Sequence, residues 1–424
     1  MSDEFDLYAG VDWGSEWHEV HVMTADRATV LHDRFEHSGD GLHRLAETLS
    51  KLGDPSRTTV AIELPRGPVV EGLLKQGFAV FSINPKQLDR FRDRHTVAGA
   101  KDDRLDALVL ADSIRTDRHC FHRARFDDAL VVELRELNRV DDDLKDQFNA
   151  LCNRARALFH RYYPAMLQLS PHVSEPWIWR LFELAPTPAK ARKLRPQRVE
   201  KLLGEHRIRR VKARDVVKTL RARPVEVAPG SDTAAVLHLE LLVPQLRLVR
   251  AQRKALRQRI EHVLTKLSEP DGDAEGQPEE HRDAAVLRSL PGVGIKVAAT
   301  MLSEAAQAIA ERDHGTLRAF AGVAPITRAS GKRSRVVMRR ACNSRLRNAT
   351  YHWARVASQC DEHWKGVYGA LRKRGHSHGR ALRTVSDRLL SVLVGMLKSG
   401  TLYDGSRWTP KEPDQTSAEV KAAA

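Results

Sequence analysis

The 424 residues suffice for two or three domains, and a 42% hydrophobic content suits globular folding. Lys and Arg total 70 against 55 Asp and Glu, and this net charge of +15 favours nucleic acid over a membrane as partner, unless the chain is simply Arg-rich throughout. The four cysteines lack metal-site or disulfide-framework spacing, the acidic N-terminus does not resemble a signal peptide, and no apolar run reaches membrane-spanning length, so we expect a cytoplasmic protein.

The first 125 residues are expected to form an α/β domain. Leu42, Leu45, Leu49 and Leu52 mark one face of a helix that follows three strand-like segments. Short apolar or alternating runs predict the strands themselves, at residues 7–11, 19–23, 28–35, 58–62 and 78–83. Strands that alternate with helices are typical of a layered α/β architecture.

Four carboxylates are the candidate metal ligands of this domain. Asp12 and Glu63 each follow a predicted strand, and strand ends gather at one edge of such a sheet. Asp103 and Asp106 stand three apart, so on a helix they project from one face. An Asp pair near a helix start is also a common capping pattern, and alone it is weak evidence. Together the four acids suit hard divalent cations that could clamp a phosphodiester.

The middle of the chain, residues 126–281, is expected to be helical. Apolar residues at helical spacing over 130–158 and 239–267 predict two long amphipathic helices, which form either a coiled coil or the core of a helix bundle. Residues 195–223 hold eleven Lys or Arg against three acids, which favours a phosphate-contacting surface at Arg209, Arg210 and Lys212 over a merely solvated helix face. The acidic stretch 268–281 reads as a linker.

A third region, residues 282–400, carries a glycine turn and a basic run. Gly292 and Gly294 lie in a Pro-Gly-Val-Gly turn that indicates either a helix-hairpin-helix phosphate site or an ordinary helical hairpin. Residues 328–347 hold eight Lys or Arg and no acid. The candidate nucleic-acid contacts here are Lys332, Arg333, Arg335, Arg339, Arg340 and Arg347. From sequence alone, Ser330 in this run is a phosphate-contacting or capping residue, because no base lies beside it to activate its hydroxyl.

Several motifs, taken together, resemble the insertion-sequence-110 transposase family, which includes Piv-type DNA invertases and bridge-RNA-guided recombinases. Tyr-Ala-Gly-Val-Asp-Trp-Gly, Ala-Ile-Glu, Asn-Pro-Lys-Gln and Lys-Asp-Asp-Arg-Leu-Asp-Ala occur in the order of its RuvC-like nuclease domain. The four acids fall on its DEDD positions, with Asp102 at a Thr position and Leu64-Pro65 replacing the usual small pair after Glu63. Gly-Val-Ala-Pro, followed by Ser-Gly-Lys, resembles its C-terminal transposase domain, although Ala341 replaces a usual glycine.

The resemblance implies a mechanism and a set of partners. Asp12, Glu63, Asp103 and Asp106 would bind Mg²⁺, or Mn²⁺, and Ser330 would be the nucleophile that joins DNA covalently. Ser334 and Ser344 are the alternative nucleophiles. The implied partners are donor and target DNA, a structured RNA encoded by the element, and further copies of the chain as dimers assembling into a tetramer, the coiled coil serving dimerisation and RNA contact.

The sequence therefore predicts a RuvC-like domain over 1–125, a helical coiled-coil region over 126–281, a mainly α serine transposase domain over 282–400, and a disordered tail over 401–424. The predicted function is that of an RNA-guided DNA recombinase or transposase. Three alternatives stay open: a metal-dependent RuvC-like nuclease or junction resolvase, an RNA-independent DNA invertase, and an inactive nucleic-acid-binding protein. No membrane partner is expected.

Overall fold

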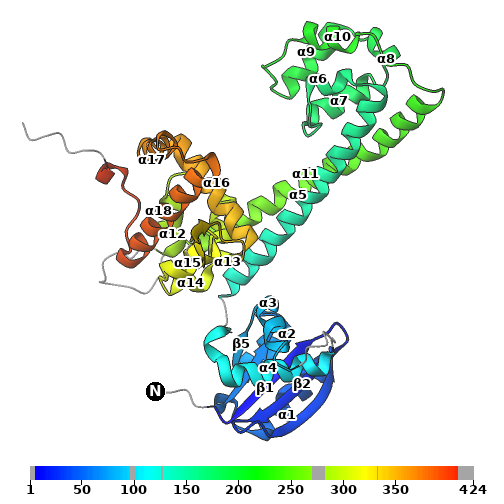
Figure 1. The fold of residues 1–424 in the computed structure, drawn as a ribbon. Coiled ribbons are helices and arrows are strands. Elements are labelled where there is room, and N and C mark those ends of the chain that lie inside the picture. The colour runs from blue at the N-terminus through cyan, green and yellow to red at the C-terminus, as the bar shows by residue number, and fades with distance from the viewer. Residues whose placement is uncertain (1–4, 96–101, 126–127, 270–281, 332, 409–424) are drawn as a thin grey trace, which may run out of the picture. The chain divides into compact units, whose positions relative to one another are not determined.

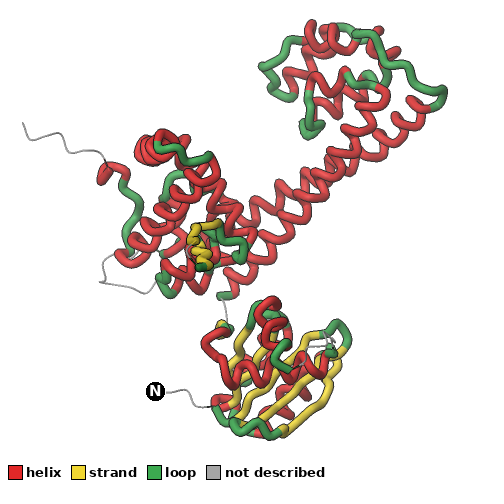
Figure 2. Tube along the Cα trace, in the orientation of Figure 1, coloured by secondary structure: helices red, strands yellow, loops and turns green. Residues whose placement is uncertain are grey.

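The computed structural model describes residues 5–95, 102–125, 128–269, 282–331 and 333–408. By its internal contacts the chain divides into two units, Met1–Asp127 and Asp128–Ala424 (Figure 1). Figure 2 shows that the described strands lie in the first unit, apart from one small hairpin in the second. The prediction of an α/β N-terminal region and a mostly helical remainder is therefore confirmed.

The first unit is built on a six-stranded sheet. Its strands are β1 (Leu7–Trp13), β2 (Trp17–Thr24), β3 (Thr29–Glu36), β4 (Thr58–Ile62), β5 (Ala79–Ser82) and β6 (His122–Arg123). They lie in the order β3-β2-β1-β4-β5-β6. The β1–β2–β3 meander is antiparallel, β1, β4 and β5 run parallel, and β6 returns antiparallel to β5. This topology is consistent with the RuvC-like domain that the resemblance implies.

Four helices accompany this sheet: α1 (Gly39–Leu52), α2 (Pro68–Lys75), α3 (Pro85–Arg92) and α4 (Asp103–Asp117). Alternate residues of the central strands enter two separate cores. Val11 and Ile62 pack with residues of α1 and α2, whereas Ala61 and Phe81 pack with residues of α3 and α4. The sheet is thus covered on both faces, as is usual for parallel strands rich in buried aliphatic residues.

The second unit contains a long two-helix hairpin made of α5 (Ala129–Tyr162) and α11 (Ser231–Lys266) (Figure 1). The 34 residues of α5 give a length of about 51 Å at 1.5 Å per residue. One half of the hairpin packs into a helical tip, and the other half belongs to the C-terminal core. Helix α11 continues through Pro244, which lies inside the helix.

The helical tip surrounds a core of buried aromatic and aliphatic side chains. Its helices are α6 (Ala165–Leu169), α7 (Pro176–Leu184), α8 (Pro188–Arg192), α9 (Pro196–Glu205) and α10 (Ala213–Leu220). Trp177 and Trp179 are each only 1% exposed, and the Trp179 indole donates to the Val173 carbonyl oxygen at 2.7 Å. The basic stretch of residues 195–223 therefore belongs to a packed subdomain with an apolar interior.

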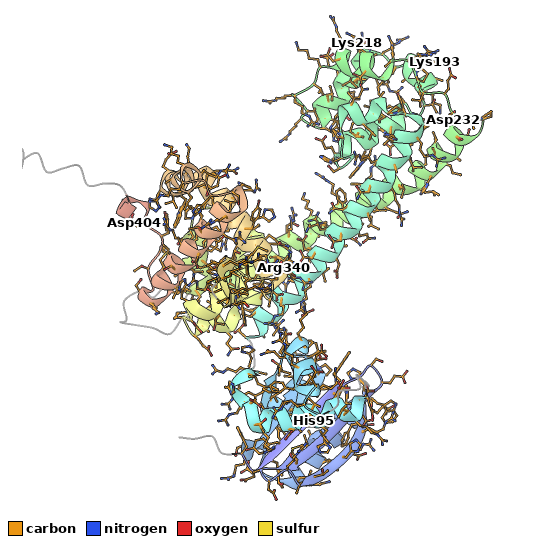
Figure 3. All side chains as sticks on the ribbon, in the orientation of Figure 1. His95, Lys193, Lys218, Asp232, Arg340 and Asp404 are labelled. Atoms are coloured by element: carbon orange, nitrogen blue, oxygen red, sulfur yellow. The ribbon has the colours of Figure 1, made fainter. Side chains whose placement is uncertain are left out.

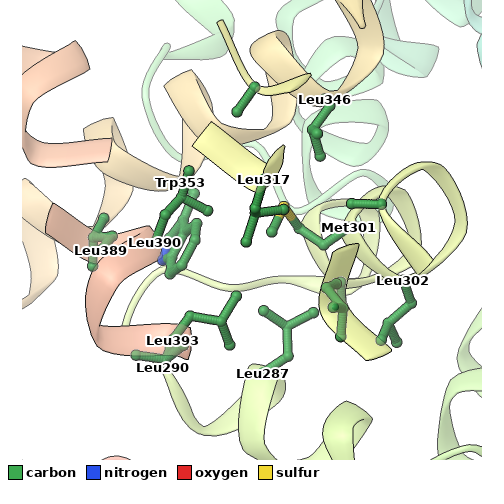
Figure 4. Packing of buried hydrophobic residues seen from close by; sticks show 14 of the residues in the cluster. Leu287, Leu290, Met301, Leu302, Leu317, Leu346, Trp353, Leu389, Leu390 and Leu393 are labelled. Atoms are coloured by element: carbon green, nitrogen blue, oxygen red, sulfur yellow. The ribbon is translucent and has the colours of Figure 1, made fainter. Parts of the chain in front are cut away.

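The C-terminal helices form a fourth apolar core, shown in Figure 4. They are α12 (Asp283–Ser289), α13 (Ile295–Glu304), α14 (Ala306–Ala310), α15 (His314–Phe320), α16 (Ser344–Cys360), α17 (Glu362–Lys373) and α18 (His378–Ser399). Trp353 is buried at its centre and donates its indole N–H to the Pro291 carbonyl oxygen at 3.0 Å. Leu134 of α5 and Ile260 of α11 lie in the same core, so the base of the hairpin is part of this domain.

The sequence missed one element of this domain, the hairpin of β7 (Ile326–Ser330) and β8 (Arg333–Val337). The predicted linker lies outside the described residues from 270 to 281, as does the predicted tail from 409 onward. Within the described parts of the chain, no helix combines the length and apolarity needed to span a membrane.

Candidate active site

Asp12 and Glu63 come directly after two paired residues of adjacent parallel strands. Val11 of β1 is in register with Ile62 of β4, so the next residue of each strand reaches the same edge of the sheet. Side chains alternate between the faces of a strand, which puts Asp12 on the face of Gly10. Both acids are half-buried. The expectation that strand ends bring these two carboxylates to one edge agrees with this geometry.

Helix α4 crosses the face that carries Asp12, in very close contact with β1. A Cβ atom built on Gly10 would lie 2.0 Å from the Ala107 carbonyl oxygen and 2.5 Å from the Ala111 amide nitrogen. At the other end of the helix, Arg115 donates to the Ala25 carbonyl oxygen at 3.1 Å. Ala25 follows β2 beside the start of β1, so α4 runs antiparallel to β1. Its first turn therefore lies toward the strand end that carries Asp12.

The first turn of α4 holds three acids with different environments. The Asp102 carboxylate caps the helix by accepting the Arg104 amide N–H at 3.2 Å. This position is the one where the family motif has Thr, and capping explains why an acid is tolerated there. Asp103 is exposed, whereas Asp106 is only 2% exposed.

Asp106 forms an ion pair with Arg92, the last residue of α3. The Arg92 Nε donates to Asp106 Oδ1 at 2.6 Å, and Arg92 Nη1 donates to Asp89 Oδ1 at 2.8 Å. The hydrogen bond from Arg92 to Asp106 is the main cause that holds the pKa of Arg92 above its usual value. Short, charge-assisted bonds of this kind are about twice as strong as neutral ones.

The residue types of this edge fit a divalent cation, because carboxylate oxygens are the ligands that Mg²⁺ and Mn²⁺ prefer. In the part of the chain that is described, however, these side chains are not arranged to hold such a cation. Among the residues that the structure describes, no group of three or more His, Cys, Asp or Glu side chains is placed to hold a metal ion. Asp106 instead has a guanidinium as its partner.

Two residues near this edge were not found from the sequence. Arg92 is one, and Glu19 is the other: it is in register with Asp12 on β2, so both side chains leave the same face. The Glu19 carboxylate Oε2 lies 3.3 Å from His32 Nε2. The alternation of the strand could have placed Glu19 on this face, but only the register of the hairpin puts it opposite Asp12.

Ser330 lies in the other unit, at the end of strand β7. It is exposed and pairs in register with Arg333 across the hairpin. Gly331 has a φ of +54°, which is the left-handed region that favours glycine in tight turns. Lys332 lies outside the described residues. The turn therefore presents the Ser330 hydroxyl at the tip of an exposed, cationic hairpin.

The other predicted nucleic-acid contacts of this region differ in exposure and in their bonds to the rest of the protein. Arg333, Arg335 and Arg340 are exposed, and Arg339 is half-buried. Arg347 is also half-buried and is held internally, because its Nη2 donates to the Arg340 carbonyl oxygen at 3.0 Å and its Nε lies 2.9 Å from Cys342 Sγ. Arg347 thus stabilises the segment between β8 and α16.

The two alternative nucleophiles are less suitably placed than Ser330. Ser334 lies on β8 opposite Ala329, away from the turn of the hairpin. Ser344 begins α16, which Asn343 caps by accepting the Leu346 amide N–H at 3.1 Å. Both serines are exposed.

The two glycines of the predicted phosphate-binding turn have different surroundings. A Cβ on Gly292 would lie 2.6 Å from the Ala357 amide nitrogen, so this residue allows α16 to approach the turn closely. Gly294 is exposed and precedes α13. Its open position leaves it available to a ligand, whereas Gly292 is used in packing.

In the tip, Arg209 and Lys212 are exposed, but Arg210 is held by a protein partner. Its Nη1 and Nη2 donate to the two Glu175 carboxylate oxygens at 2.7 and 2.6 Å. Lys193 and Lys218 project from the tip into solvent (Figure 3).

Fold and site define a protein with an acidic α/β domain, consistent with a RuvC-like one, joined to a helical, basic remainder. Comparison with known families gives two matches, a transposase model over residues 9–164 and the IS116/IS110/IS902 transposase model over residues 284–369. A candidate transposase of the IS117 mini-circle from Streptomyces coelicolor is 30% identical over 415 residues, which is 96% of this chain and 97% of that relative. The chain belongs to the IS110 family of transposases.

Other relatives agree with this assignment. A candidate transposase of Sinorhizobium fredii is 46% identical over 216 residues, covering 50% of this chain and 60% of that protein. A 42 kDa protein of insertion element IS900 from Mycobacterium paratuberculosis is 27% identical over 406 residues, covering 94% of this chain and 97% of the relative. The resemblance drawn from the sequence motifs is thereby confirmed at the level of the family.

Proposed function

We propose that this transposase is a site-specific DNA recombinase that cuts and rejoins DNA through a covalent phosphoserine intermediate. The observation that carries the proposal is the gathering of Asp12, Glu63 and the first turn of α4 at one edge of the sheet. Carboxylates brought to one edge repel one another, and a bound cation would offset that repulsion.

The acids have one role in this proposal. Asp12, Glu63, Asp103 and Asp106 hold Mg²⁺, with Mn²⁺ as a substitute. When bound, the cation polarises the scissile phosphate and stabilises the negative charge that develops during displacement. Asp103 is the most accessible ligand, because it is exposed, whereas Asp106 has to change partner.

Ser330 is the nucleophile in this proposal. Its Oγ loses a proton and forms a bond with phosphorus, the scissile P–O bond breaks, and the other DNA end leaves as a hydroxyl. The exposed position of Ser330 beside a glycine turn supports this role, because a hairpin tip can approach a phosphate without steric obstruction. Arg333 and Arg335 on the same hairpin supply cations for the flanking phosphates.

The test uses two serines of the same hairpin. DNA carrying the element's ends is incubated with the full-length protein and Mg²⁺, and protein–DNA adducts are separated on a denaturing gel. Ser330→Ala should abolish the adduct, while Ser334→Ala, an equally exposed neighbour, should retain it. If Ser330→Ala still cleaves DNA without an adduct, the protein is a metal-dependent nuclease in which water attacks.

A further variant separates catalysis from simple binding. Asp103→Ala should abolish DNA processing while leaving DNA affinity nearly unchanged, because one exposed carboxylate contributes little to phosphate contact. If DNA processing proceeds equally without divalent metal and in Asp103→Ala, the proposed chemistry is wrong. An inactive nucleic-acid-binding protein would show binding but no processing at all.

The proposed partners are donor and target DNA, a structured RNA encoded beside the gene, and further copies of the chain as dimers that form a tetramer. Basic tip residues such as Arg209 and Lys212 support contact with phosphate backbones. RNA guidance is tested by reconstituting recombination with and without RNA transcribed from the flanking non-coding DNA. Equal recombination without RNA would indicate a Piv-like invertase instead.

A further inference from the structure

The contact between Arg92 and Asp106 occupies one of the four carboxylates on which the proposed function depends. The Asp106 side chain is 3% exposed and the Arg92 side chain 16%, so the pair is largely removed from water. An unpaired carboxylate in such a place is strongly unfavourable, because it loses hydration and gains nothing in return. The guanidinium thus compensates the Asp106 charge while no cation is bound.

Arg92 could leave Asp106 without unfolding its surroundings. The chain that follows it is held to α4 by two other contacts: Arg94 forms an ion pair with Asp117 at 3.0 Å, and His95 Nε2 lies 3.4 Å from Asp112 Oδ2. Arg92 also has a second, largely exposed partner, Asp89, in the preceding turn of α3. Rotation of the Arg92 side chain alone would therefore free Asp106 and keep the guanidinium paired.

We propose that Arg92 is an internal counter-ion that competes with the divalent cation for Asp106. This inference rests on the proposed metal site. In the metal-free protein Arg92 pairs with the buried Asp106 carboxylate. A divalent cation held by the other acids would compete with the guanidinium for Asp106, and Arg92 would then remain with Asp89. Arg92 is thus a positioning residue that keeps the site intact but lowers its apparent affinity for metal.

The expected change in metal affinity follows from the populations of the paired and open states of Arg92 and Asp106. If the paired state must open before the cation binds, the apparent dissociation constant is larger by the ratio of paired to open states. A charge-assisted hydrogen bond of this kind makes that ratio roughly tenfold or more. Removing the guanidinium should therefore tighten metal binding by about tenfold.

The test measures Mn²⁺ binding to the full-length protein by electron paramagnetic resonance of free Mn²⁺. Arg92→Ala should bind Mn²⁺ about tenfold more tightly than the wild type, with Arg92→Lys in between. Its Tm without metal should be lower, and saturating Mn²⁺ should raise that Tm by more than it raises the wild-type value. Arg94→Ala removes a neighbouring exposed ion pair without contact to Asp106, and serves as the control with wild-type affinity.

The outcomes are distinct. Equal Mn²⁺ affinity in folded wild-type, Arg92→Ala and Arg92→Lys proteins would overturn the role of Arg92 and leave the metal site standing. If none of them binds Mn²⁺, the metal-dependent function fails, and the role of Arg92 fails with it. Should Arg92→Ala not fold, Arg92→Gln, which retains a hydrogen-bond donor without the charge, gives the same comparison. Asp106→Asn in the Arg92→Ala background should abolish the gain in affinity.

Discussion

Gly10→Ala should destabilise the first unit and disturb its acidic edge. The new Cβ would lie 2.0 Å from the Ala107 carbonyl oxygen, whereas ordinary Cβ contacts begin at 3.4 Å, so α4 has to retreat by as much as 1.4 Å. The obstructing atoms belong to the helix backbone, and no side-chain rotation can relieve the contact. Overpacking of this kind costs about 1–3 kcal/mol, partly offset by the lower unfolded-state entropy of alanine.

The displacement matters for chemistry because α4 carries Asp103 and Asp106. A shift of about 1 Å in a positioned group can cost on the order of 100-fold in rate. We expect Gly10→Ala to lose most DNA processing under conditions where it is still folded, as measured by urea denaturation and by cleavage of element-end DNA.

The matched control for this experiment is Gly72→Ala on α2. A Cβ at Gly72 meets nothing within 4 Å, so alanine should leave activity unchanged and stabilise the helix by about 0.5–1 kcal/mol. Gly10→Ala protein with wild-type stability and activity would refute the argument that this close contact positions the acids.

Three further predictions concern pH and charge. Burial, followed by the neighbouring His37, lowers the pKa of His18 from 6.5 to about 4. Its neutral form therefore stabilises the fold above pH 6.5, and up to about 3 kcal/mol of the free energy of unfolding is lost as the pH falls toward 4. His18→Leu should reduce this dependence of the free energy of unfolding on pH, measured by urea denaturation. Burial raises the pKa of Asp142, but hydrogen bonds from Lys296 and Arg345 outweigh it and lower the pKa below 3.8. Asp142→Asn should cost about 1–2 kcal/mol at pH 7 and reduce the loss of stability below pH 3.8. Replacing Lys193 and Lys218 together by Glu should weaken binding to duplex nucleic acid and lower the slope of log K against log salt by about 2, measured by fluorescence anisotropy.

The sequence predicted those parts of the fold whose cause is local. The strands at Leu7–Trp13 and Thr58–Ile62 were found because a short apolar run bounded by polar residues has few other stable conformations in a layered domain. The two strand-end acids followed from the same reasoning, since parallel strands share a carboxyl edge. The long helices α5 and α11 followed from apolar spacing over many turns.

The features that the sequence missed depend on contacts between distant residues. The two strands of the β7–β8 hairpin are mostly exposed and carry three Arg, so the hydrophobic alternation that identifies strands is weak. The pairing of Arg210 with Glu175 joins residues 35 positions apart. Neither contact leaves a periodic signal, and an arginine held by a carboxylate looks in sequence like one free for phosphate.

The acidic edge and the serine hairpin differ in how firmly the protein holds them. Asp106 is buried and ion-paired, and its helix rests directly on the strand that carries Asp12. Ser330 instead lies on a two-stranded hairpin whose residues are mostly exposed, an element that is marginal without added contacts. The Arg side chains of this hairpin repel one another, and phosphate groups would relieve that repulsion. DNA binding should therefore order the proposed nucleophile, whereas the acidic edge is maintained without DNA.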